Sequence, residues 1–281
     1  MEKLYGVIGD PIAQSMSPDM HNSSFKALGL EATYKAFHVT PERLESALEG
    51  VRGLGMGGLN VTIPHKVSVM KFLDEIDPLA SKIGAVNTVV NENGKLIGYN
   101  TDGMGYVTSL KEILQEKSLE NSSILLIGAG GAARAIYFSL LEEGVKQLDI
   151  ANRTVENART IINGQPSSLS KAMGLLEAEN DLHAYDVIIN TTSIGMYPNK
   201  DDIPLSLHNI KSSTIVSDII YNPLETRWLQ EARAKGAITQ NGVGMFVFQG
   251  ALAFEKWTGI YPDIDIMRNA ILTKLGGTHK C

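Results

Sequence analysis

The feature that most constrains the fold of this chain is a glycine-rich turn directly after an apolar strand. SSILLIG, residues 122–128, is typical of a buried strand, and GAGGAAR then opens an apolar helix that runs to Glu143. Gly128, Gly130 and Ala133 fit the pattern G-x-G-x-x-G/A in that setting. The glycines allow a tight turn and bring backbone N–H groups close to a pyrophosphate at the start of the helix. The pattern predicts a dinucleotide-binding domain, and a glycine turn that binds nothing is the alternative.

The rest of the chain alternates predicted strands and helices, which indicates an α/β fold with parallel sheets. Asn93-Gly94 between two apolar runs predicts a hairpin within residues 85–100. Ser17 is expected to cap a helix that runs through Leu28, and another helix is expected from about Lys66. Further strands are expected at 3–9, 33–39, 57–63, 147–152, 185–190 and 214–218, a helix at 41–50, and only helix from residue 242 onward.

This alternation runs through two cycles, so we expect two domains. Residues 1–102 and 240–281 form a discontinuous α/β substrate domain, and residues 103–239 form a Rossmann-type domain. The chain would then cross twice between the domains, near residues 102 and 240. Those crossings suggest a hinge, and a cleft between domains is a common place for a ligand.

Composition excludes several classes of protein. The 25 Lys and Arg against 31 Asp and Glu give a net charge of −6, which argues against a nucleic-acid or anionic-membrane partner. The only cysteine is Cys281, so no intramolecular disulfide and no cysteine-based zinc site can form. Neither a signal peptide nor a membrane span is visible in the sequence. We expect a soluble cytoplasmic protein, either a monomer or a homodimer.

The residues after the next predicted strand indicate which dinucleotide binds. A domain that binds NAD usually carries Asp or Glu there to accept hydrogen bonds from the ribose. This chain has Asn152, Arg153 and Thr154, while Asp149 lies inside the strand and Glu156 beyond it. A guanidinium suits a 2′-phosphate, so the sequence predicts NADP. The alternative for Arg153 is an ordinary exposed loop arginine.

Small polar residues gather at the ends of the early strands. QSMSP offers two hydroxyls, from Ser15 and Ser17, beside a helix N-terminus, where a carboxylate could bind. Gln249 is the only polar side chain between Val243 and Phe254, so it either pairs with a neighbouring backbone group or faces a polar ligand. The other candidates are Asn60, Thr62 and Lys66 of NVTIPHK, Asn87 of GAVNT and Asp102 of YNTDG. Together they describe a pocket for a polyol acid, although each alone is more often a turn or cap residue.

Lys66 and Asp102 are the candidates for acid–base chemistry. A cation or proton donor must meet a carbonyl oxygen as a hydride reduces it, and a lysine at a strand tip can do so. Asp102 would hold the ammonium in place. His65 is the rival base, and no histidine or cysteine spacing predicts a metal site.

The ordered motifs GDPIAQSMSPDMHN, GLNVTIPHK, GAVNT, YNTDG, GAGGAAR, NRT, DIIYNP and GVGMFVFQ closely resemble the shikimate dehydrogenase family along essentially the whole chain. The resemblance implies NADP-dependent interconversion of 3-dehydroshikimate and shikimate, a step toward chorismate and aromatic amino acids. It also implies roles for individual residues. The shikimate carboxylate would be held by Ser15 and Ser17, near Tyr221; the ring hydroxyls by Thr62, Lys66, Asn87, Asp102 and Gln249; and NADP by Gly128, Ala129, Gly130, Gly131, Ala132, Asn152, Arg153 and Thr154, with Ile219 and Gly242 at its nicotinamide end.

Two alternatives remain open from the sequence. One is a quinate/shikimate dehydrogenase that uses NAD, which Arg153 disfavours. Asn157 stands where the family often has a second basic residue, and Arg159 is the nearest substitute. The other alternative is a non-catalytic NADP-binding module, which the Lys66 and Asp102 pair disfavours.

Overall fold

The protein is described by a computed structural model that covers residues 2–114 and 118–276, so Cys281 lies outside it. The chain divides into two units. Unit 1 contains Met1–Gly105 and Val247–Cys281, and unit 2 contains Tyr106–Phe246. The division falls inside two helices, α4 (Asp102–Leu114) and α9 (Val243–Thr258), each of which contributes residues to both units. The boundaries predicted from the sequence are near residues 102 and 240.

Unit 2 is built on a six-stranded sheet in the order β12-β11-β10-β7-β8-β9. Each pair of neighbouring strands in this sheet is parallel. Numbered along the chain from β7, the order read from the β9 edge is 3-2-1-4-5-6, which is the strand order of the Rossmann fold. The strands are β7 (Ser123–Ile127), β8 (Gln147–Ala151), β9 (Ala172–Met173), β10 (Val187–Asn190), β11 (Ile215–Asp218) and β12 (Ile238–Gln240).

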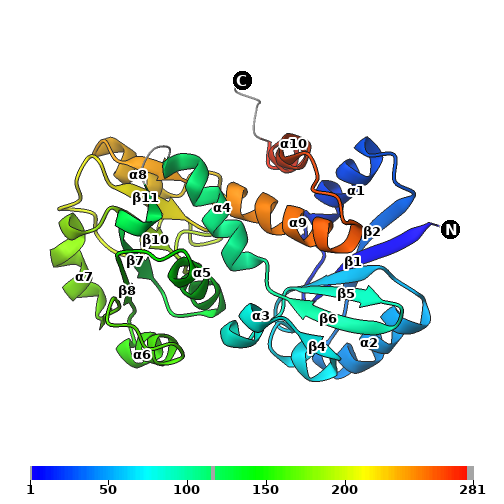
Figure 1. Ribbon diagram of the computed structural model, residues 1–281. Helices are drawn as coiled ribbons and strands as arrows, with labels where there is room; N and C mark the ends of the chain where they lie inside the picture. The colour runs from blue at the N-terminus through cyan, green and yellow to red at the C-terminus, as the bar shows by residue number, and fades with distance from the viewer. Residues whose placement is uncertain (1, 115–117, 277–281) are drawn as a thin grey trace. The chain divides into compact units, whose positions relative to one another are not determined.

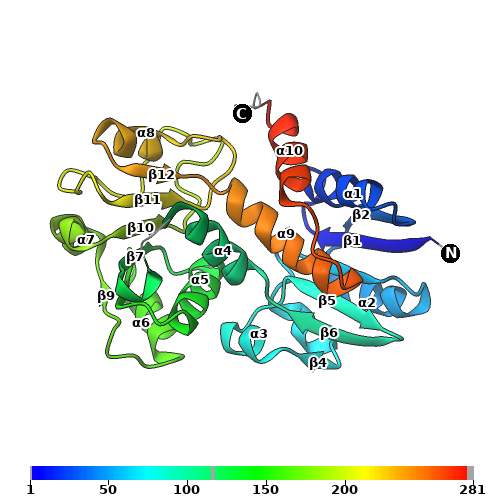
Figure 2. The same ribbon diagram turned by 45° about the horizontal axis from the view of Figure 1, so that its top comes forward.

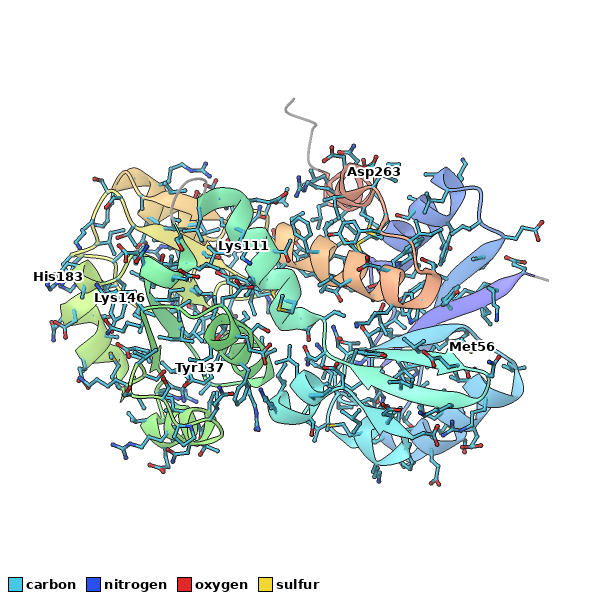
Figure 3. The ribbon with its side chains drawn as sticks, in the orientation of Figure 1. Met56, Lys111, Tyr137, Lys146, His183 and Asp263 are labelled. Atoms are coloured by element: carbon cyan, nitrogen blue, oxygen red, sulfur yellow. The ribbon has the colours of Figure 1, made fainter. Side chains whose placement is uncertain are left out.

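Parallel strands need long crossover connections, and all of these contain a helix except the one between β10 and β11, where residues 191–214 form turns (Figure 1). Lys111 of α4, labelled in Figure 3, forms an ion pair with Glu143, 2.7 Å apart, and so ties α4 to the end of α5. Buried strand residues such as Leu125, Ile188 and Val216 form the core with Trp228. The helices of unit 2 are α5 (Gly131–Glu142), α6 (Val155–Asn163), α7 (Leu175–Asp181) and α8 (Arg227–Ala234), with 3₁₀ turns at Leu119–Asn121 and Leu182–Ala184.

Unit 1 is built on a second six-stranded sheet, in the order β2-β1-β3-β5-β6-β4. Its strands are β1 (Lys3–Gly9), β2 (Ala32–His38), β3 (Gly58–Val61), β4 (Glu75–Ile76), β5 (Thr88–Glu92) and β6 (Lys95–Tyr99). Strands β1, β2 and β3 are parallel, whereas β5 runs antiparallel to both β3 and β6. Asn93 and Gly94 both have positive φ, which gives the tight turn between β5 and β6 (Figures 1 and 2).

Most helices of unit 1 pack on this sheet, and the last helix packs on the first. The helices of unit 1 are α1 (Ser17–Ala27), α2 (Leu44–Gly53), α3 (Pro78–Ile83), the unit 1 part of α9, and α10 (Ile264–Lys274), with 3₁₀ turns at Pro41–Arg43 and Ser68–Phe72. Helix α10 lies beside α1 (Figure 2), and Lys274 pairs with Asp19 across them. Asp263, labelled in Figure 3, caps α10 by accepting from the N–H groups of Asp265 and Ile266. The last helix is therefore part of the N-terminal half of the fold.

The predicted α/β class is confirmed, but three local predictions are wrong. The sheet of unit 1 is mixed rather than parallel, because the Asn93-Gly94 turn reverses the chain. No α-helix starts at Lys66: its carbonyl accepts from Val86 N–H at 2.8 Å instead of from a residue one turn on. Ser17 does not cap α1, because Met16 occupies the N-cap position and the Ser17 N–H donates to Ser15 Oγ at 3.3 Å.

Short strands also escaped the sequence analysis. Strands β9 and β12 have two and three residues and carry too little periodicity to be recognised. Both lie at the edges of the unit 2 sheet, where they complete the six-stranded order.

A buried carboxyl group joins the loops after two neighbouring strands of unit 2. Asp218 ends β11 with 1% of its surface exposed. It accepts hydrogen bonds from Ile220 N–H at 3.0 Å, Thr226 Oγ1 at 2.9 Å and Asn190 Nδ2 at 3.1 Å. Burial raises the pKa of Asp218 from 3.8 to about 6, and the three hydrogen bonds partly offset that rise.

The raised pKa of Asp218 predicts that stability depends on pH in a specific direction. The folded protein favours the protonated carboxyl, so this contribution is full below pH 3.8 and is lost as pH rises through 6. The loss amounts to about 3 kcal/mol. Asp218→Asn removes the titration. The melting temperature of the variant minus that of wild type should therefore increase from pH 4 to pH 7. Asp201→Asn, at an exposed aspartate, is the control, and an Asp218→Asn difference that stays constant with pH would contradict the assignment.

Candidate functional site

In unit 2 the sheet changes direction of winding between β7 and β10, and a Rossmann sheet binds its ligand at that point. Gly128 follows β7 with φ +108°, and Thr191 follows β10. A Cβ added to Gly128 would lie 2.7 Å from Thr191 Oγ1 and 2.8 Å from Thr192 Cγ2. Both the backbone angle and the close approach therefore require glycine here.

The start of α5 is open to a ligand. Gly130 is the N-cap, and no side chain caps the helix, so its first N–H groups are left for another acceptor. A Cβ added at Gly130 or Gly131 would meet nothing within 4 Å, so a side chain position at either residue points into open space. Ala129 and Ala132, the other predicted residues of the turn, have only methyl side chains. A pyrophosphate could approach the backbone closely at such a turn.

The residues predicted to select NADP over NAD follow β8, at the same end of the strands as Gly128. Asn152 bridges the turn by donating from Nδ2 to Thr154 O at 2.8 Å, and Thr154 precedes α6 without capping it. Arg153 is exposed, and within residues 2–114 and 118–276 it has no ion-pair partner. Arg159, in contrast, pairs with Glu156 at 3.1 Å. Arg153 is thus the guanidinium available to a phosphate at this strand end.

The carboxylate inside β8 cannot serve a ribose. Asp149 is 2% exposed, and it accepts from Lys171 N–H at 2.7 Å and from Tyr185 Oη at 2.8 Å. These partners come from the protein's own core. Asp149 is therefore a structural residue, and no acidic side chain ends the strand.

Two further predicted residues lie together in unit 2. A Cβ at Gly242 would fall 2.0 Å from Ile219 O, so glycine allows the two backbones to touch. The Gly242 N–H also donates to Ile220 O at 2.9 Å. Tyr221, two residues after Ile219, packs against Phe246 with ring centroids 5.0 Å apart, and burial raises its pKa. Of the residues predicted to bind substrate, Tyr221 is the one in unit 2.

In unit 1 the strand order places the predicted polar residues together at one end of the strands, which is called here the site edge of the sheet. The chain leaves β1 toward Ser15, leaves β3 toward Lys66 and leaves β6 toward Asp102. It enters the antiparallel strand β5 through Asn87 at the same edge, opposite the end of β3. The mixed sheet thus brings together four stretches that lie far apart in the sequence.

The centre of this edge is an ion pair. Lys66 Nζ donates to Asp102 Oδ2 at 2.6 Å, with 32% of the lysine side chain and 14% of the aspartate side chain exposed. Lys66 lies in the turn after β3, and Asp102 is the first residue of α4. Asn87 donates from Nδ2 to Asp102 Oδ1 at 2.8 Å. Gln249 Oε1 lies 3.5 Å from the same nitrogen, so Lys66, Asp102, Asn87 and Gln249 form one cluster.

Helix packing brings Gln249 to this cluster. A Cβ added to Gly105 of α4 would lie 2.5 Å from Gln249 N, so the absence of a side chain at Gly105 lets the backbones of α4 and α9 approach. Gln249 is therefore placed by backbone contact next to the helix that begins with Asp102.

The remaining predicted residues are near the ends of β1 and β3. Ser15 Oγ accepts from Ser17 N–H, and Ser17 is buried at the start of α1. Thr62 donates its N–H to Ile8 O at 3.0 Å, and its Cγ2 lies 2.6 Å from the position of a Cβ on Gly9. These contacts hold the three residues in place; no hydrogen bond among the described residues joins them to the Lys66–Asp102 pair.

His65 is not available as a base. It is fully buried, and its Nε2 donates to Val39 O at 2.6 Å. No group of three His, Cys, Asp or Glu side chains within the described ranges could hold a metal ion. Among helices in the same ranges, none has the length and apolar character of a membrane span.

Buried polar residues lie behind the cluster, and of these the sequence analysis named Asn60 but overlooked Thr88 and Thr101. Asn60 is 7% exposed, Thr88 is fully buried and Thr101 is 2% exposed. All three hydrogen bond to Asn87. The available signal for Thr88 was a polar residue beside an apolar run, since it directly precedes Val89 and Val90.

Models of known protein families match most of the chain. The model of the shikimate dehydrogenase substrate binding domain matches residues 7–89. The model of shikimate / quinate 5-dehydrogenase matches residues 109–220, and that of the shikimate 5′-dehydrogenase C-terminal domain matches residues 242–272. The NADP(+)-dependent shikimate dehydrogenase of Geobacillus sp. (strain WCH70) is 59% identical over 278 residues, covering 99% of this chain and 100% of the relative. The chain belongs to the shikimate dehydrogenase family. The family predicted from the sequence motifs is confirmed.

Solved structures of shikimate dehydrogenases have the same fold. One in complex with NADP+ is 46% identical, with a TM-score of 0.91 over 98% of this chain and 96% of that one. The shikimate 5-dehydrogenase of Thermus thermophilus, in complex with NADP(H) and shikimate, is 35% identical, with a TM-score of 0.86 over 95% of this chain and 98% of that one. The two-part α/β architecture is therefore that of the shikimate dehydrogenase family.

The glycine turn gives a prediction that separates folding from binding. Gly128→Ala should lower the melting temperature, because positive φ and the contact with Thr191 cost about 1–3 kcal/mol. Gly130→Ala should leave the melting temperature nearly unchanged but weaken NADP binding, because its φ is −95° and its methyl group enters only the open space. Thermal melts and cofactor titration test this pair. Equal loss of stability in both variants would refute the prediction.

Proposed function

We propose that this chain catalyses the reversible NADPH-dependent reduction of 3-dehydroshikimate to shikimate, on the pathway to chorismate and aromatic amino acids. The observation that carries the proposal is the Lys66–Asp102 pair, partly exposed and joined to Asn87, in a chain that also has the Rossmann strand order and a glycine turn. A non-catalytic NADP-binding module would not need such a pair. An absorbance assay with shikimate and NADP+ tests the activity directly.

The two units divide the task in this proposal. Unit 2 binds NADP through the turn of Gly128–Ala132 and the loop of Asn152–Thr154, with Ile219 and Gly242 at the nicotinamide end. The free N–H groups and open space at α5 fit a pyrophosphate. When bound, NADPH supplies the hydride. Unit 1 binds the substrate, so residues 1–102 and 240–281, with bounds close to those units, act as the substrate domain.

Lys66 acts as general acid in reduction and as general base in oxidation. Negative charge develops on the substrate oxygen as the carbonyl is reduced, and the lysine ammonium can stabilise that charge and donate a proton. Asp102 Oδ2, at 2.6 Å, fixes the direction of the ammonium, while one third of the Lys66 side chain remains exposed to meet a ligand. The lysine and aspartate therefore work as one unit.

The polar residues of the same edge select the substrate. Ser15 and Ser17 bind the carboxylate, because their hydroxyls lie beside the start of α1. Thr62, Asn87 and Gln249 bind ring hydroxyls together with the catalytic pair. A site that hydrogen bonds to each hydroxyl rejects analogues that lack one, because buried polar groups would then stay unpaired.

Arg153 selects NADP. A guanidinium can pair with the 2′-phosphate through two parallel hydrogen bonds, and the only carboxylate in β8 is occupied by core partners. Quinate oxidation with NAD is the second candidate, because the model that matches residues 109–220 describes both substrates. Arg153 favours the first candidate. We place the reaction in the cytoplasm, where reduced pyridine nucleotides are available, and propose no nucleic-acid or membrane partner, in keeping with the net charge of −6.

The proposed role of Lys66 predicts a loss of turnover. Lys66→Met should lower kcat by about 10²–10⁴-fold, the usual effect of removing an acid–base group, while KM for shikimate changes much less. Steady-state kinetics with shikimate and NADP+ measure both. Lys71→Met, at an exposed lysine five residues away, is the control and should keep wild-type kinetics. Near-normal kcat with a raised KM would make Lys66 a binding residue instead.

The proposed role of Arg153 predicts a change in cofactor preference. Arg153→Ala should raise KM for NADP by about 10- to 150-fold, since a hydrogen bond to a charged group contributes about 1.5–3 kcal/mol. KM for NAD should change little. Arg159→Ala is the matched control, because Arg159 is paired with Glu156 and should contribute little. A similar change in KM for both cofactors would contradict the role proposed for Arg153.

A further inference from the structure

Behind the Lys66–Asp102 pair lies a buried chain of side-chain hydrogen bonds within unit 1. It runs from Tyr34 through Asn60 and Thr88 to Asn87, and ends on Asp102. Asn60 and Thr88 are cross-strand neighbours in β3 and β5. The direction of each hydrogen bond can be derived, because two backbone groups fix which atoms donate and which accept.

The first fixed point is a backbone carbonyl. Asn60 Nδ2 lies 3.2 Å from Asn87 O, and a carbonyl can only accept. The amide nitrogen of Asn60 therefore faces that side, and its second hydrogen goes to Thr88 Oγ1 at 3.1 Å. Asn60 Oδ1 is left to accept from Tyr34 Oη at 2.7 Å.

Thr88 continues the series of hydrogen bonds from Asn60 to Asn87. Its hydroxyl has one hydrogen, and it already accepts from Asn60. Of its two possible acceptors, Asn87 Oδ1 at 3.0 Å is nearer than Thr101 Oγ1, so the hydrogen is assigned to Asn87 Oδ1. The Thr101 hydroxyl lies 3.3 Å from Thr88 Oγ1 and closes the cluster on its other side.

The second fixed point is a backbone N–H. Thr101 N–H can only donate, and it points at Asn87 Oδ1 at 2.8 Å. With donors from Thr88 and Thr101 on its oxygen, the Asn87 amide has one favourable orientation. Its nitrogen then faces Asp102 Oδ1 at 2.8 Å and Thr101 Oγ1 at 2.9 Å.

We propose that Thr88 is a positioning residue for the reaction, and that its hydroxyl, oriented by Asn60, holds the Asn87 amide with its nitrogen toward Asp102. This inference rests on the proposed function. A rotated Asn87 amide would turn its oxygen toward the carboxylate, where two acceptors repel each other. Thr88 opposes that rotation without touching substrate or cofactor. The Asp102 carboxylate is then kept in the position from which it directs Lys66.

The Tyr34 end of this series of hydrogen bonds is held in place by aromatic packing. Tyr34 stacks on His21 with ring centroids 4.4 Å apart and an interplanar angle of 18°. His21 is fully buried, and burial lowers its pKa to about 3, so the ring is neutral. Burial also raises the pKa of Tyr34 well above 10, so its hydroxyl stays a donor. A neutral, buried donor thus begins the series of hydrogen bonds that ends on Asp102.

The test replaces the Thr88 hydroxyl and compares turnover with binding. Thr88→Val keeps the shape of the side chain, and Thr88→Ala removes the hydroxyl without adding a methyl group beside Asn60. Both should lower kcat for shikimate oxidation by about 3- to 10-fold, the effect of one neutral hydrogen bond, with little change in KM for NADP. Thr88→Ser restores a hydroxyl and should remain within about 2-fold of wild type.

Thr214→Val is the matched control, since Thr214 is a buried threonine of unit 2 whose hydroxyl, among the described residues, hydrogen bonds only to Tyr185 O. It should keep the wild-type kcat. Thermal melts of all variants separate misfolding from loss of positioning. Wild-type kcat in Thr88→Val or Thr88→Ala would overturn the inference, and so would a loss in Thr88→Ser equal to that in Thr88→Ala. If wild type itself does not oxidise shikimate, the proposed function fails instead.

Discussion

The ion pair between Lys66 and Asp102 is the interaction on which the rest of the account depends. A lysine and an aspartate 2.6 Å apart are common on protein surfaces, where such pairs contribute little to stability. This pair differs because its aspartate side chain is only 14% exposed and because a buried amide, Asn87, occupies its second oxygen. The arrangement directs a partly exposed ammonium outward, which suits a group that must meet a ligand and exchange a proton.

Topology explains why such a cluster forms from distant stretches. In an all-parallel sheet, Asn87 would enter its strand at the edge opposite the end of β3. The Asn93-Gly94 hairpin makes β5 antiparallel to β6, and β5 also pairs antiparallel with β3, so the entry to β5 lies at the same end of the sheet as the exits from β3 and β6. Gly105 then lets the backbone of Gln249 approach the helix that starts at Asp102. Unit 2 instead uses a wholly parallel sheet, whose switch in winding leaves an open glycine turn.

Much of this could be predicted from the sequence, and the failures have physical causes. The glycine turn, the Asn-Gly hairpin and the long strands carry local sequence signals. Their positions along the chain could therefore be predicted. The helix expected at Lys66 did not form because Val86 takes the Lys66 carbonyl, a tertiary contact that no local pattern reveals. Thr88 was overlooked for a similar reason: its hydrogen bond with Asn60 crosses between strands, and only the register of β3 and β5 brings the two residues together.

A double-mutant cycle on kcat tests most directly whether Lys66 and Asp102 act as one unit. Lys66→Met, Asp102→Asn and the double variant would be compared with wild type in shikimate oxidation at saturating substrates. If Asp102 works through Lys66, the double variant should lose about as much activity as Lys66→Met alone, because nothing is left for Asp102 to direct. Losses that multiply in the double variant would show that the residues contribute independently, and that result would contradict the account.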